Sequence, residues 1–199
     1  MKTNSQIRNS ARECMQGHWG KGAFVTFLYV ILCIGSSYLS ILALFFVLPL
    51  ALGWYIFSLN LVLKRESLSV GNLFGAFGNG LYWKSIGLHL LMALYTFLWT
   101  LLLIVPGFIK SYSYRLAPFL SIENPELSSA KAIEKSMKMM KGHKMDLFLI
   151  DLGYTAWCIL GGILTLGLGL LWIIPYYQIV AAKFYVEVKR EFEGGNPEK

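Results

Sequence analysis

The sequence contains little charge for its length. Of its 199 residues only 15% are Asp, Glu, Lys or Arg, and 56% are hydrophobic, whereas an ordinary soluble domain carries roughly a quarter charged residues. Charged residues are missing altogether from 22–63, 85–109 and 152–182. Because a helix that spans a bilayer needs about 20 mostly apolar residues, these stretches exclude a soluble globular enzyme and predict an integral membrane protein.

Cysteines and catalytic motifs are also scarce. The three cysteines, Cys14, Cys33 and Cys158, are odd in number and form no CxxC pair, which argues against a disulfide framework or a zinc site. The chain has no HExxH, no GxSxG and no phosphate-binding glycine loop. We therefore expect no catalytic residues, no cofactor and no bound metal. An intramembrane enzyme with an unfamiliar site is the remaining alternative.

One proline in each apolar stretch predicts a hairpin of two helices. Bulky apolar residues precede Pro49, Pro106 and Pro175, and proline suits the first turn of a helix because its missing N–H costs nothing there. The predicted helix pairs are 23–44 with 48–64, 83–103 with 106–122, and 147–169 with 172–189. A turn at residues 35–37 is the alternative for the first pair. The pattern predicts six transmembrane helices.

A short amphipathic segment precedes each of these pairs, and each segment ends in a glycine. Gly17, Gly78 and Gly142 suit a left-handed helix stop, where the missing Cβ removes the strain. The unit of amphipathic interfacial helix plus transmembrane hairpin therefore occurs three times in tandem. We predict an all-α polytopic membrane protein with a single membrane domain over 1–199 and internal repeats over about 1–66, 67–127 and 128–199.

Basic residues are concentrated between the hairpins, and the formal net charge is +7. Since Lys and Arg accumulate on the cytoplasmic side, we expect a multi-pass protein of the cell membrane with both termini in the cytoplasm. No base-reading motif accompanies the charge, so nucleic-acid binding is excluded. The amphipathic helices either lie at the interface and cap the bundle or dock a partner. The candidate residues for binding anionic lipid headgroups are Arg8, Arg12, Lys131, Lys135, Lys138 and Lys141.

Ionisable residues inside the predicted spans are functional candidates because they are costly in a bilayer. Arg115 and Lys183 fall at similar depths after their prolines, and Asp151 lies on the inner part of the fifth span. In the structural interpretation Asp151 pairs with one of these cations. In the functional one, the cations line a cavity that attracts anions. His89 is expected either to bond a nearby backbone carbonyl or to take part in proton or metal chemistry.

The third repeat resembles a known family. The motif Ala132–Lys144, the segment Leu164–Gly169 and the pair Pro175–Tyr176 are similar to an uncharacterised bacterial membrane family, catalogued as domain of unknown function 975. The likeness is most specific over 105–185. The resemblance implies a polytopic bacterial membrane protein, and it implies no activity.

Two functions besides an enzyme are consistent with these features. The first is a non-enzymatic scaffold or adaptor that engages anionic lipid on the cytoplasmic face, a protein partner or a second copy of itself. The alternative is a small transporter or channel-like protein whose polar interior contains the charged residues and histidine of the spans. A water-accessible cavity that reaches these residues distinguishes the two.

Overall fold

The computed structural model describes residues 3–37, 41–64, 69–78 and 80–194, and it contains no strand among them. The predicted all-α class is confirmed. The boundary expected at residues 66–67 between the first two repeats lies outside the described residues. The helices are α1 Asn4–Met15, α2 Trp19–Ser37, α3 Ile41–Leu63, the 3-10 helix η1 Val70–Phe77, α4 Leu81–Leu102, α5 Ile104–Tyr114, α6 Ala117–Glu123, α7 Ser129–Met139, α8 Lys144–Leu164 and α9 Leu170–Gly194.

Three of the described helices are long and apolar enough to cross a membrane: α3 over Phe45–Leu63, α4 and α8. A fourth candidate combines α1 with Trp19–Ile34 of α2, although these two helices are bent by 94° at their connection. These helices are consistent with a membrane protein. Six spans and a tandem repeat stay predictions.

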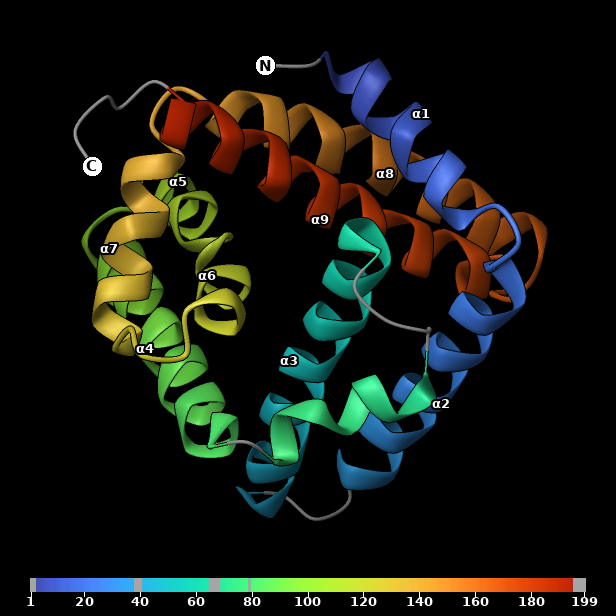
Figure 1. The fold of residues 1–199 in the computed structure, drawn as a ribbon, viewed down its shortest axis with the longest axis horizontal. Coiled ribbons are helices and arrows are strands. Elements are labelled where there is room, and N and C mark those ends of the chain that lie inside the picture. Colours follow the sequence, from blue (N-terminus) through green and yellow to red (C-terminus); the bar gives the residue numbers. More distant parts are fainter. Residues whose placement is uncertain (1–2, 38–40, 65–68, 79, 195–199) are drawn as a thin grey trace.

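Three helices, α1, α8 and α9, lie together along one side of the molecule, at the top of Figure 1. Helices α2 and α3 lead away from this side, and α4, α5 and α7 lie on the opposite side of α3 from α2 (Figure 1). Helix α3 is central, because it contacts α1, α2, η1, α4, α6 and α9. The last turns of α3 thereby reach the main core.

That core also buries the apolar faces of two amphipathic helices. In α1, Ile7, Ala11 and Met15 are inaccessible to solvent, and in α7, Ala132 and Ile133 are equally buried. Their partners in the core come mainly from α6 and α9: Leu116, Phe119, Leu120, Ile179, Phe184, Tyr185 and Val188. Both helices therefore turn their apolar stripe toward protein and leave the basic side outward.

The turn expected before Pro49 is wrong, because Pro49 lies inside α3, which begins at Ile41. The connection between α2 and α3 falls on 38–40, outside the described residues. Proline inside a helix leaves the carbonyl four residues earlier without its donor. Here that carbonyl belongs to Phe45, and the Tyr82 hydroxyl of α4 donates to it at 3.1 Å. A side chain from another helix thus makes the internal proline tolerable.

The other two proline turns are closer to expectation. Pro106 lies in the first turn of α5, three residues after the extended residue Leu103. Pro175, however, lies inside α9, and the chain turns earlier at 165–169, where Leu166 and Gly167 have positive φ values of 51° and 90°. The prediction that Pro175 opens its helix is therefore wrong by about one turn.

Two of the three helix-ending glycines have the left-handed conformation. Gly17 and Gly142 have φ values of 77° and 94°, whereas Gly78 has φ −107° and is extended. The left-handed residue in the second segment is Gly80, with φ 71°, just before α4. The expectation at Gly78 is wrong because the preceding segment forms a 3-10 helix and the chain leaves it in an extended conformation.

The predicted helix 106–122 is broken. Helix α5 ends at Tyr114, and α6 begins at Ala117 with Pro118 in its first turn. Because Pro118 offers no N–H and disfavours helical backbone before it, the two helices cannot continue smoothly into one another. The Leu116 N–H donates instead to the Ser136 hydroxyl of α7, at 3.2 Å. This break places Arg115 at a helix end rather than along a continuous span.

Candidate functional site

Arg115 and Asp151 are joined through a third residue. The Arg115 Nη2 donates to the Tyr177 hydroxyl at 2.6 Å, and that hydroxyl donates to Asp151 Oδ1, also at 2.6 Å. The three side chains come from the end of α5, from α8 and from α9. The charges therefore compensate one another across a neutral hydroxyl, without a direct ion pair.

The same three side chains line a cavity of about 470 Å³, a volume within the range of roughly 300–1,000 Å³ found for small-molecule sites. The other lining residues are Tyr154, Thr155, Cys158, Ile159 and Leu170. Arg115 and Asp151 therefore compensate one another's charge and also line a cavity, so the structure is consistent with both the structural and the functional interpretation. Lys183 is not among the described lining residues, so the structure does not group it with Arg115.

Tyr177 is the site residue that sequence reasoning missed. It follows Tyr176 near the start of α9, where an aromatic residue is expected to pack or to anchor the helix. Its ring also lies near the guanidinium, with 6.0 Å from its centroid to Arg115 Cζ. The only signal available in the sequence was the need of Asp151 for a hydrogen-bond donor.

His89 bonds a nearby backbone carbonyl, which is the first of its two predicted roles. Its Nδ1 lies 2.8 Å from the Ser85 carbonyl one turn earlier in α4. In the part of the chain that the structure describes, no group of three or more His, Cys, Asp or Glu side chains could hold a metal ion.

The basic residues of α1 and α7 are displayed on the surface. Arg8, Arg12, Lys131, Lys138 and Lys141 are exposed, and Lys135 is half-buried. The Lys138 Nζ lies 2.8 Å from Glu134 Oε1, and this hydrogen bond lowers the pKa of the Glu134 carboxyl. The exposed cations Arg8 and Arg12 are called the basic face of α1 below, and Lys131, Lys138 and Lys141 the basic face of α7. Helices α1 and α7 themselves lie on different sides of the molecule (Figure 1).

A second polar group, also missed from the sequence, ties α6 to α9. The buried Glu123 carboxylate accepts a hydrogen bond of 2.6 Å from the Tyr185 hydroxyl and pairs with the Lys189 ammonium. A buried carboxylate needs such partners because leaving it alone costs several kcal/mol, as an order of magnitude. This group is structural, since it fixes the short α6 in the core.

Residues 100–191 match the model of a protein family described as Protein of unknown function (DUF975). The predicted resemblance to this family is confirmed over these residues, and a bacterial source and a polytopic membrane topology stay predictions. The DUF975 match includes Arg115, Asp151 and Tyr177, whereas α1 lies outside it. No curated protein and no solved structure matches the chain. Because DUF975 has no described function, function must be argued from the sites themselves.

Proposed function

We propose that the protein is a non-enzymatic, multi-pass membrane scaffold or adaptor that engages anionic lipid headgroups through the basic faces of α1 and α7. In this proposal three hairpins cross the cell membrane, and both termini face the cytoplasm, as the distribution of Lys and Arg favours. The exposed apolar surfaces of α4 and α8 support a lipid environment, since only 17% of each span is buried in the protein.

The observation that carries the proposal is the orientation of the two amphipathic helices. Ile7 and Met15 in α1 and Ile133 in α7 are packed into the core. The basic residues on the opposite side of each helix are therefore held outward by a fixed scaffold. Each Lys or Arg near an anionic membrane surface contributes about 1 kcal/mol to the attraction, so a group of them concentrates anionic lipid.

The test is the lipid composition around the purified protein in nanodiscs made from equal amounts of phosphatidylglycerol and phosphatidylcholine. We expect the protein to enrich phosphatidylglycerol, and we expect the enrichment to fall when Arg8, Arg12, Lys131, Lys138 and Lys141 are all replaced by Gln. The matched control is Arg190→Gln, an exposed cation of α9 outside both faces. Equal enrichment by the parent and the five-residue variant would refute the proposal.

A transport function is the second candidate, and the cavity lined by Arg115, Tyr177 and Asp151 favours it. Cys158 lines the same cavity and provides a native reporter once Cys14 and Cys33 are replaced by Ser. Rapid modification of Cys158 by a charged thiol reagent in intact membranes would indicate a water-accessible path. If the thiol reacts only after the membrane is dissolved, a transport path is excluded and the scaffold stands.

A further inference from the structure

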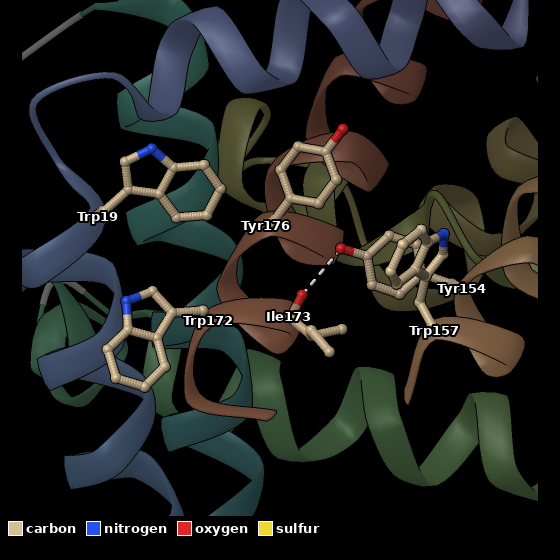
Figure 2. Close-up of a pocket in the computed structure, with 6 residues that line it drawn as sticks. All are labelled: Trp19, Tyr154, Trp157, Trp172, Ile173 and Tyr176. Carbon is tan, nitrogen blue, oxygen red and sulfur yellow. Dashed lines mark hydrogen bonds between the residues drawn. The ribbon is translucent and has the colours of Figure 1, made fainter. Parts of the chain in front are cut away.

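An aromatic pocket of about 310 Å³ opens beside the polar cavity. Figure 2 shows Trp19 and Trp172 on one side of it and Tyr154 and Trp157 on the other, with Tyr176 and Ile173 between them. These residues come from the start of α2, from α8 and from the start of α9. The pocket therefore exists only where three separate segments of the chain meet.

The walls of this pocket are apolar because its tyrosine hydroxyls are already used. The Tyr176 hydroxyl donates to the Arg8 carbonyl at 3.0 Å, and the Tyr154 hydroxyl donates to the Ile173 carbonyl at 2.9 Å. The rings of Trp19 and Tyr176 stack with their centroids 5.9 Å apart. A guest in the pocket thus meets ring faces and aliphatic carbon.

The mouth of the pocket is cationic. A second hollow of about 550 Å³ is bounded by Arg8, Asn9 and Arg12 of α1 and shares four aromatic residues with the pocket: Trp19, Tyr154, Trp157 and Tyr176. The Arg8 guanidinium lies over Gly153 of α8, since a Cβ at Gly153 would lie 3.7 Å from Arg8 Nη1. No carboxylate is among the described residues that line this mouth.

Two tryptophans of the pocket are not explained by packing within the protein. Trp157 is 67% exposed and Trp172 is 49% exposed, although an indole is among the largest apolar surfaces that a side chain can bury. The exposed apolar surface of α8 continues beyond Trp157 through Leu160, Ile163 and Leu164. An acyl chain that lies along α8 would cover both indoles and this surface.

We infer that Trp19, Tyr154, Trp157, Trp172, Ile173 and Tyr176, with Arg8 and Arg12 at the mouth, form a binding site for one anionic phospholipid. The phosphate lies at the two guanidiniums, where charge-assisted hydrogen bonds to Arg are strong, and the first part of an acyl chain lies against the aromatic rings. This inference rests on the proposed function and adds a single stoichiometric site to a general affinity for anionic lipid.

The inference is tested by native mass spectrometry of the full chain in detergent, titrated with phosphatidylglycerol or with phosphatidylcholine of the same acyl chains. We expect one phosphatidylglycerol per protein, bound at least about tenfold more tightly than phosphatidylcholine. Glycerol 3-phosphate, which carries the phosphate without a chain, is expected not to bind detectably. Equal retention of the two lipids would overturn the inference.

Three variants locate the bound lipid. Arg8→Gln with Arg12→Gln removes the cations, Trp157→Ala with Trp172→Ala removes the ring faces, and Gly153→Leu fills the mouth without changing charge. Each is expected to weaken the single site by at least about tenfold. The controls are Arg190→Gln and Trp83→Ala, which alter an exposed cation and an exposed indole away from the pocket.

The outcomes separate this inference from the proposed function. If phosphatidylglycerol is enriched in nanodiscs but no single lipid is retained, or if the variants retain it as the controls do, the pocket is not the site and the scaffold proposal stands. If neither enrichment nor a retained lipid is found, both proposals fail. A retained lipid that is lost only in the pocket variants supports the inference.

Discussion

Helices α3 and α8 are nearly equal in length and apolar character, yet they have different surroundings. Of the span in α3, 56% is buried inside the protein, against 17% in α8. Helix α3 packs against six other helices, whereas α8 presents Leu149, Leu152, Ile159, Leu160 and Ile163 to its surroundings. Hydropathy thus measures exclusion from water and does not distinguish a protein core from a lipid environment.

Two glycines, Gly53 in α3 and Gly162 in α8, show the same difference in surroundings. In α3, a Cβ at Gly53 would lie 1.8 Å from the Leu73 carbonyl oxygen of η1, so the two backbones are in direct contact. In α8, a Cβ at Gly162 would meet no atom within 4 Å. Packing against η1 therefore requires a glycine at position 53, whereas position 162 has room for a side chain.

The largest effect that would test this comparison comes from two tryptophans. Trp54 of α3 is 6% exposed and packs on Tyr29 and Phe57, with ring centroids 5.3 and 6.1 Å away. We expect Trp54→Ala to lower the free energy of unfolding by about 3–5 kcal/mol. Trp157→Ala on α8 should change it by no more than about 0.5 kcal/mol, measured by denaturant unfolding in detergent followed by circular dichroism.

Equal losses for the two tryptophan variants would break the comparison. They would mean that α8 packs against protein over the Trp157 surface, as in a dimer, and the mass of the complex in detergent would then show a second copy.

Replacing Gly53 or Gly162 by alanine should change the free energy of unfolding by a smaller amount, and the change should have opposite signs in α3 and α8. Gly53→Ala forces the α3 and η1 backbones apart and should cost about 1–3 kcal/mol. Gly162→Ala should stabilise α8 by about 0.5–1 kcal/mol, because glycine loses more backbone entropy in a helix than alanine does. Thermal unfolding of both variants beside the parent measures the difference, and a stable Gly53→Ala variant would show that η1 is not held against α3.

Part of this fold follows from local patterns in the sequence. The apolar stretches predict helices, and the helical spacing of Ile7, Ala11 and Cys14 predicts roughly which side of α1 faces the core. In the structure Met15 completes the buried side, and Cys14 is only half-buried. The break after α5 was also predictable, because Pro118 gives the same local signal as Pro106. The depth predicted for Arg115, by contrast, was counted from Pro106 along one unbroken helix, and this count misses that α5 ends just before Arg115.

Other features depend on contacts that no local pattern contains. Pro49 is accommodated inside α3 because Tyr82, from a different helix, supplies a donor to the Phe45 carbonyl. Tyr177 joins Arg115 to Asp151 only because α5, α8 and α9 meet. The aromatic pocket likewise joins residues from segments more than a hundred positions apart in the sequence.

The last prediction concerns Asp151 of α8 and its link to Arg115. Tyr177→Phe removes two hydrogen bonds from the Arg115–Asp151 linkage, and we expect a loss of about 0.5–1.5 kcal/mol for each bond that cavity water does not replace. Asp151→Asn should lower stability as well, and the double variant should lose less than the sum of the two, because the residues belong to one network. Additive losses in unfolding experiments would show that Tyr177 and Asp151 act independently.

The contact between α1 and α9 has a consequence for the order in which the molecule can be assembled. A ribosome makes α1 long before α9, so the surface that will bury Ile7, Ala11 and Met15 does not yet exist when α1 emerges. During that interval a helix with one apolar side and one basic side can rest on an anionic membrane surface. The amphipathic pattern of α1 therefore suits two successive environments, first the bilayer surface and later the completed core.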